Sequence, residues 1–175
     1  MQLVTPRTFS FKKRLAYYGV GVAAFVIAYS VGASIQITKD QASAMASQFA
    51  EETSGIGMIG LYLNNLQAAL VMFIPGFGAG FGAYTGSSTG LLFAAIASTY
   101  ELQGVSPLAV LATPFGVLEV LAYGLAMSRS GLLAYQLVKK KPWKEYLVPT
   151  GIEIAIVAVI LLVAAISEAQ VIAPA

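Results

Sequence analysis

Residues 75–90, PGFGAGFGAYTGSSTG, contain two short motifs that perform chemistry in other proteins. Residues 78–83 fit the dinucleotide-binding pattern G-x-G-x-x-A, and Glu101 follows at the distance of a ribose-binding carboxylate. Residues 86–90 fit G-x-S-x-G, the turn that presents a serine nucleophile. The first motif needs a preceding strand and access to water, and the second needs a neighbouring base. Apolar stretches flank both motifs instead, so neither function is expected.

The residue types that the chain lacks exclude further chemistry. It contains no cysteine and no histidine, so a thiolate, an imidazole base and the usual ligands of zinc, copper and haem are all absent. No lysine falls inside an apolar stretch to serve as an alternative base for a serine. The sequence therefore predicts a protein that is not an enzyme and that needs no cofactor, metal, nucleotide or nucleic acid.

The balance of apolar and charged residues is that of a membrane protein. Apolar residues make up 58% of the 175 residues, charged residues 10%, and the mean hydropathy is +0.78. Soluble domains carry about 25% charged residues, because their surface must face water. We therefore expect an integral membrane protein whose main surroundings are the lipid bilayer.

Five apolar stretches predict an all-α helical bundle in one transmembrane domain, residues 15–172, after a basic segment at residues 1–14. The expected spans are residues 15–35, 57–77, 82–98, 108–138 and 147–166. The first span could also be a signal peptide. Its apolar run is longer than the apolar region of a signal peptide, about 7–15 residues, so an uncleaved span is favoured. The fourth, about 31 residues, must be tilted, kinked at Pro114 or extended beyond the membrane.

The basic residues predict the orientation. With five spans and a cytoplasmic N-terminus, Lys39 is the one basic residue outside. The basic residues of the inner segments are Arg7, Lys12, Lys13, Arg14, Lys139, Lys140, Lys141 and Lys144. We therefore expect a multi-pass protein of the cell membrane. Its extracytoplasmic segment, residues 36–55, is expected to hold an interfacial helix that begins after Thr38, with the apolar face Ala42, Met45, Ala46 and Phe49.

The glycines of residues 75–90 have helical spacing. Gly78, Gly82, Gly86 and Gly90 recur at every fourth position, and Gly76 and Gly80 repeat the spacing on a neighbouring face. Residues i and i+4 share one face of a helix, and small residues there let membrane helices approach closely. The pattern predicts a packing face toward another helix of the chain or a partner, on one helix or on two halves broken near Pro75.

Glu119 is the most unusual residue of the predicted spans. It lies roughly 17 Å into the fourth span at 1.5 Å per residue. A carboxylate at this depth must be protonated, paired or in a wet cavity. Candidate partners in the second span are Asn64, Asn65 and Gln67. Glu119 could belong to an ion, proton or partner site, or it could be a neutral carboxyl that holds two helices together.

Other polar residues of the spans have more ordinary interpretations. We expect Arg129 to extend toward the cytoplasmic headgroups, Glu153 to neutralise nearby lysines and Glu168 to lie at the outer interface. Pro114 and Gly116 should break the fourth helix beside Glu119. Such a break can build a transport site, or it can simply fit the helix into the bundle.

Three blocks of the chain resemble the stage II sporulation protein M family, over residues of about 55–172. Residues 113–119, TPFGVLE, followed by Ala122 and Gly131, resemble its P-H-G-x-x-E-x-x-A block. Residues 63–69, LNNLQAA, then 75–76 and 89–90, resemble its asparagine segment and glycine-rich middle. Residues 164–169, AAISEA, are similar to its last span. Phe115 stands where the family usually has histidine, and Thr89 where it commonly has asparagine.

The resemblance implies a multi-span protein without catalysis that acts as a scaffold or as an accessory subunit of a membrane complex. Asn64, Asn65, Glu119 and Glu168 would then be structural or partner-contact positions, and the partner would be another membrane protein or a second copy. The alternative is a transporter or channel component that uses Glu119 and the broken fourth helix, although the five spans show no paired repeat. An intramembrane hydrolase is disfavoured, because histidine, cysteine and a close aspartate pair are missing.

Overall fold

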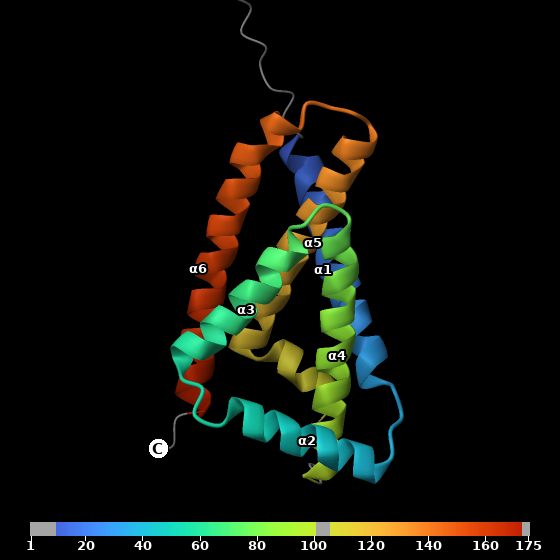
Figure 1. Cartoon of the computed structure of the whole chain (residues 1–175), viewed down its shortest axis with the longest axis vertical. Helices are drawn as coiled ribbons and strands as arrows, with labels where there is room; N and C mark the ends of the chain where they lie inside the picture. Colours follow the sequence, from blue (N-terminus) through green and yellow to red (C-terminus); the bar gives the residue numbers. More distant parts are fainter. Residues whose placement is uncertain (1–9, 101–105, 173–175) are drawn as a thin grey trace, which may run out of the picture.

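Helices form almost all of the chain that the computed structural model describes, namely residues 10–100 and 106–172. No strand occurs in these two ranges, which confirms the all-α expectation. Arg7 and Glu101 lie outside the described residues. The elements are α1 (Phe11–Ala33), α2 (Lys39–Thr53), α3 (Met58–Met72), α4 (Phe77–Thr99), η1 (Pro107–Ala112), α5 (Pro114–Val138), η2 (Trp143–Tyr146) and α6 (Leu147–Ile172) (Figure 1).

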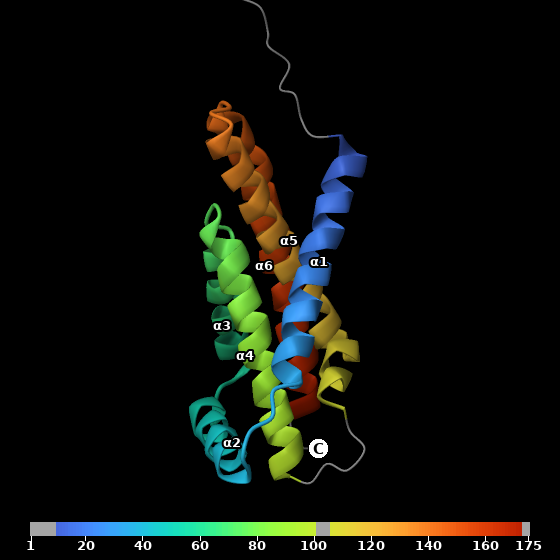
Figure 2. The same ribbon diagram turned by 90° about the vertical axis from the view of Figure 1, so that its right-hand side faces the viewer.

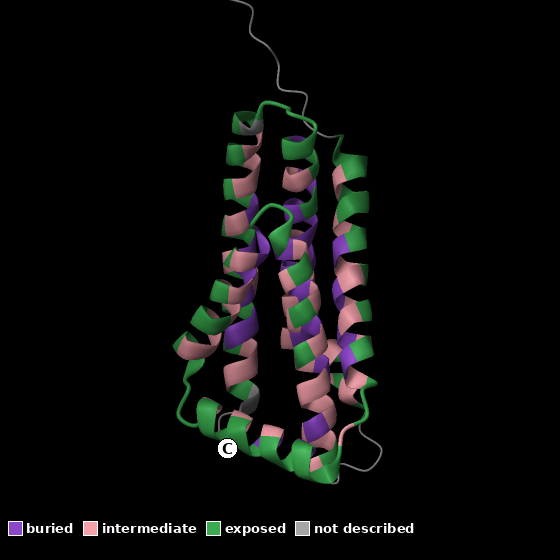
Figure 3. Ribbon diagram, turned by 45° about the vertical axis from the view of Figure 1, so that its right-hand side comes forward, coloured by how far each residue is buried: buried purple, intermediate pink, exposed green. Residues whose placement is uncertain are grey.

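The helices α1, α4, α5 and α6 run along the long axis, α3 runs obliquely beside them, and α2 lies across one end (Figure 1). The start of α1 and the α5–α6 turn are at the opposite end from α2. Buried residues line the inward sides of the long helices, whereas α2 is exposed along most of its length (Figure 3). The core includes Phe25, Met72, Tyr123 and Leu161, from four different helices.

Three of the described helices are long and apolar enough to cross a membrane, and the count rises to four if one bent pair forms a single span. The three are Phe11–Ala33, Pro114–Val138 and Lys144–Gln170, and the pair is α2 with α3, bent by 115°. With its 15 residues, α3 is only about 22 Å long, and the glycines and hydroxyls of α4 make it too polar. The protein therefore has the features of a membrane protein, while five spans and the orientation stay predictions.

The break expected in the fourth span at Pro114 is confirmed, and a kink within one continuous helix, one of the three alternatives for this span, is excluded. The chain forms the 3-10 helix η1, stops, and begins α5 at Pro114. Proline suits the first helical position, where its missing N–H is not needed. The hydroxyl of Thr113 accepts a hydrogen bond from the Gly116 amide at 3.1 Å and caps the new helix.

The two chemical motifs of residues 75–90 both lie within the continuous helix α4, so neither forms a loop. Gly78, Gly82, Gly86 and Gly90 are all buried. An added Cβ at Gly90 would run into the Tyr29 carbonyl oxygen, and one at Gly82 into Met127. The row thus packs inside this chain, against α1 and α5, and α1 and α4 converge toward the α2 end (Figure 2).

Gly76 and Gly80 do not form a second packing row within the chain, and contact of Gly80 with a partner stays a prediction. Gly80 is exposed, and an added Cβ there would meet no atom within 4 Å. Gly76 lies in the turn before α4 with a φ of 77°, in the left-handed region that favours glycine. Its role is therefore to reverse the chain direction between α3 and α4.

Ser130 of α5 anchors this turn. Its hydroxyl donates to the Ile74 carbonyl at 2.5 Å and accepts from the Ala79 amide at 3.3 Å, and its own carbonyl accepts from the Gly76 amide at 3.3 Å. The α3–α4 hairpin therefore ends against the side of α5, short of the α5–α6 turn (Figures 1 and 2).

The helix expected after Thr38 is confirmed as α2. The Thr38 hydroxyl accepts from the Gln41 amide at 3.3 Å, and the Gln41 side chain accepts from the Thr38 amide at 3.0 Å. This is a capping box, which satisfies amides at the start of a helix. Ala42 and Ala46 are buried under the bundle, while Met45 and Phe49 are half-buried.

Replacing Thr38 with alanine should destabilise the start of α2 by about 1 kcal/mol, because the cap is lost. Hydrogen exchange of the α2 amides in detergent should become roughly fivefold faster, and that of α5 should stay unchanged. Thr53→Ala, at the other end of α2, is the matched control. Equal exchange in the two variants would contradict a stabilising role of the cap.

Candidate functional site

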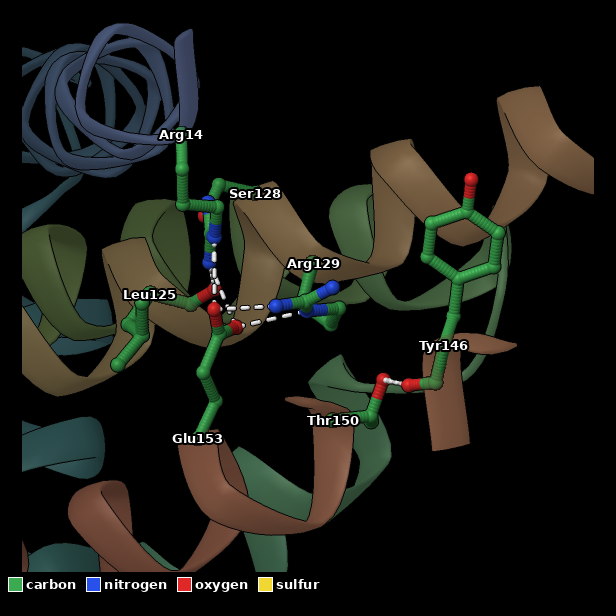
Figure 4. Close-up of polar contacts among 7 residues, drawn as sticks. All are labelled: Arg14, Leu125, Ser128, Arg129, Tyr146, Thr150 and Glu153. Atoms are coloured by element: carbon green, nitrogen blue, oxygen red, sulfur yellow. Dashed lines mark hydrogen bonds and ion pairs between the residues drawn. The ribbon is translucent and has the colours of Figure 1, made fainter. Parts of the chain in front are cut away.

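Two clusters of polar side chains lie between the helices. The first, the arginine cluster, consists of Arg14 on α1, Arg129 on α5 and Glu153 on α6 (Figure 4). Arg14 donates to both carboxylate oxygens of Glu153, at 2.7 and 2.6 Å, and Arg129 also donates to both. Ser128 accepts a further hydrogen bond from Arg14 at 2.9 Å. One carboxylate thus joins three helices.

The arginine cluster corrects two expectations. Arg129 is 5% exposed and pairs with Glu153, so it does not extend toward headgroups. Glu153 is paired with Arg14 and Arg129, not with the lysines. The reason is that α1, α5 and α6 converge at this level, and a buried guanidinium requires an anionic partner. Sequence reasoning treated each residue on its own helix and could not foresee the contact between distant helices.

The second cluster lines a cavity of about 280 Å³ near the α2 end of the bundle. Its walls come from all six α-helices and from η1. Aromatic side chains make up much of the lining: Phe25, Tyr29, Phe49, Phe93, Phe115 and Tyr123. The polar part of the lining consists of Thr53, Asn64, Asn65, Thr85, Thr89, Glu119 and Glu168. No lysine or arginine is among the residues that line it.

Glu119 is held in this cavity by α3. The Asn65 amide nitrogen donates to Glu119 Oε1 at 2.6 Å, between two helices that the chain places side by side. Of the other two candidate partners, Asn64 lines the cavity and is exposed on one side, while Gln67 is exposed and is not part of the lining. Arg129 belongs to the other cluster and does not reach Glu119.

Glu168 lies near the end of α6 and faces into the bundle, while its place at the outer membrane interface stays a prediction. It lines the same cavity as Glu119, and its Oε2 is buried without a hydrogen-bond partner among the described residues. The cause is the length of α6, which continues to Ile172, well past the expected end at residue 166. Glu168 then follows the buried Ala164 and Ala165 on the inward face of the helix.

Sequence reasoning missed the aromatic and hydroxyl parts of the cavity. Tyr29 is 1% exposed, and its hydroxyl donates to the Pro107 carbonyl at 2.9 Å, which connects α1 to η1. Thr85 and Thr89 are one turn apart on α4, beside the packed glycines. That i, i+4 spacing of hydroxyls was a usable signal. The break at Thr113 contributes as well, since Phe115 and Gly116 line the cavity and Pro114 does not.

The cavity therefore combines two carboxyl groups, amides and hydroxyls with a wall of aromatic and aliphatic side chains. Such a site can hold a ligand with an apolar body and a polar or cationic group. Within residues 10–100 and 106–172, no group of three or more Asp, Glu, His or Cys side chains is placed to hold a metal ion. Comparison of the chain with protein-family models, with curated proteins and with solved structures gave no match.

Proposed function

We propose that this chain is a non-enzymatic, multi-pass protein of the cell membrane that works as a scaffold or accessory subunit of a membrane protein complex. The proposal agrees with the resemblance to the stage II sporulation protein M family. Its partners would be other membrane subunits or a second copy of the chain. The chain itself would contribute a shaped, rigid surface and no reaction chemistry.

The outward side of the α3–α4 hairpin carries this proposal. Four exposed residues define what we call the hairpin face: Gln67, Gly80, Tyr84 and Ser88. The last three recur at every fourth position of α4 and form one stripe. Lipid cannot hydrogen-bond an amide or hydroxyl, and it gains little from small residues. A partner protein would satisfy the Gln67 amide on α3, and a helix of a partner would pack closely at Gly80 and Ser88 on α4.

We also propose five crossings with the N-terminus in the cytoplasm. In support, the basic residues of the N-terminal part of α1 and of the α5–α6 turn lie at one end of the bundle, and α2 lies at the other (Figure 1). Cytoplasmic segments are enriched in lysine and arginine. In this arrangement α3 and α4 cross the membrane as a pair that the longer helices flank.

A photo-crosslinking amino acid at position 84 should capture a partner in native membranes, because Tyr84 is 68% exposed on the hairpin face. The matched control is position 159 on α6, where valine is 62% exposed on an apolar surface. We expect a discrete protein adduct from position 84 and none from position 159. Mass spectrometry would show whether the partner is another protein or a second copy.

The same membranes should yield a stoichiometric complex after extraction in mild detergent. A chain that purifies as a monodisperse monomer, with only lipid adducts from both positions, would contradict the proposed role as a subunit. Both experiments can be interpreted before the partner is identified, because the two crosslinker positions are compared with each other and differ in the surface that they probe.

A second candidate function is favoured by one observation, the cavity beside the break between η1 and α5. A transporter or channel component would use Glu119 there as its solute-contacting carboxyl. Glu119→Gln separates the two functions. Loss of flux in proteoliposomes with an intact complex would support transport, whereas loss of the complex would identify Glu119 as a structural carboxyl.

A further inference from the structure

The cavity contains two carboxyl groups and no basic residue to neutralise them. Glu119 accepts one hydrogen bond, from Asn65, and Glu168 Oε2 is buried and has no partner among the described residues. The buried Arg129 and the partly buried Arg14 are both paired with Glu153. Buried anionic groups in a low-dielectric site attract a cation when no protein cation is in reach.

The wall of the cavity determines what kind of cation would fit. Aromatic rings from four helices line it, including Tyr29 on α1, Phe93 on α4 and Tyr123 on α5. The faces of aromatic rings attract organic ammonium groups, and their apolar surface suits a hydrocarbon body. The volume of about 280 Å³ is near the lower end of the range of small-molecule pockets, about 300–1,000 Å³. A small ligand is therefore indicated.

The cavity also has a route of entry. Two of its lining residues are exposed: Ile56, in the connection between α2 and α3, and Asn64, on α3. Glu168, near the end of α6, lines the same cavity. A ligand entering beside α3 would therefore reach a space that contains both the aromatic rings and the two carboxyl groups.

We propose that this cavity binds a small lipophilic monocation, an organic amine or quaternary ammonium compound, with its charged nitrogen between Glu119 and Glu168 and its apolar part against the aromatic residues. The inference concerns binding by the site of the second candidate function. It does not depend on whether the bound compound crosses the membrane, nor on the scaffold role.

The probe is benzyltrimethylammonium, which carries a permanent charge, and its neutral isostere neopentylbenzene has the same shape. Saturable binding to the purified chain in detergent should be measured by titration calorimetry and by thermal stabilisation. We expect the cation to bind at least about tenfold more tightly than the isostere, since a contact with a charged group is worth more than its neutral equivalent. Equal binding of the two would overturn the proposal in favour of a purely apolar cavity.

Glu119→Gln and Glu168→Gln should each lower the affinity for the cation at least about tenfold and leave the affinity for the neutral isostere unchanged. The matched control is Glu52→Gln, on the exposed side of α2, which should bind as the unaltered chain does. Unchanged affinity in both cavity variants would overturn the proposal. So would the absence of probe binding to the unaltered chain, a result that does not require any variant to fold.

Binding and transport give separate results. Proteoliposomes loaded with the cation test flux, and calorimetry tests occupancy. Binding without flux would remove the transport function and keep the inference, whereas flux of another solute with no binding of the probe would do the reverse.

Discussion

Glu153→Gln should lower the stability of the bundle by about 3–5 kcal/mol, the cost observed when one partner of a buried ion pair is removed. Two arginines converge on this carboxylate, so the substitution leaves two guanidinium groups without an anion. The exposed fractions of the three side chains are small: 16% for Arg14, 6% for Arg129 and 12% for Glu153. Water therefore cannot replace the lost charge.

The arginine cluster also predicts which of two substitutions lowers the stability more. Arg14→Met should cost less than Glu153→Gln, because Glu153 keeps its pair with Arg129. Thermal unfolding in detergent, followed by loss of the monodisperse peak in size-exclusion chromatography, gives the comparison. Glu52→Gln on α2 controls for the chemical change and should be within about 0.5 kcal/mol of the unaltered chain. Equal losses for Arg14→Met and Glu153→Gln would contradict the assignment of Glu153 as the shared anion.

Gly124→Ala should destabilise the contact between α1 and α5 by about 1–3 kcal/mol or more, since the backbones of the two helices meet there. An added Cβ at Gly124 would lie 2.8 Å from the backbone nitrogen and Cα of Val22. Backbone atoms cannot move aside as the end of a flexible side chain can. The two helices would have to separate, which would also strain the nearby contact between Gly21 and Gly124.

The control for this substitution is on the same helix. Gly131 has no atom within 4 Å of its added Cβ, so Gly131→Ala should stabilise α5 by up to about 1 kcal/mol through helix propensity. The two variants make the same chemical change and should shift the unfolding temperature in opposite directions. A similar shift for both would show that the α1–α5 contact is looser than the structure indicates.

Local signals in the sequence predicted the features that depend on neighbouring residues. The cap at Thr38 and the apolar residues of α2 follow from spacing alone, as does the buried glycine row of α4. Pro114 was correctly read as an interruption, but whether it kinks a helix or begins one depends on Thr113 and on the direction of η1.

Features that join distant parts of the chain could not be predicted in the same way. The pairing of Arg14 with Glu153 links residues 139 positions apart, and periodicity on either helix contains no information about it. The apolar run predicts that the last span ends at residue 166, whereas α6 continues to Ile172 and brings Glu168 into the cavity, one turn after the buried Ala164. The pairing of Asn65 with Glu119 could be predicted as one of three options, because an unpaired polar side chain inside a membrane costs free energy.

The short length of α3 and the small and hydroxyl residues of α4 have a consequence for biosynthesis. Insertion machinery recognises segments by their length and apolarity. Neither α3 nor α4, taken alone, satisfies both criteria. Their place in the bundle is formed by α1, which is synthesised before them, and by Ser130 and Met127 of α5, which are synthesised after them. The contacts that hold the hairpin against α5 can therefore form only after α5 has been synthesised. A nascent chain that stops before residue 114 lacks the surface that receives the hairpin.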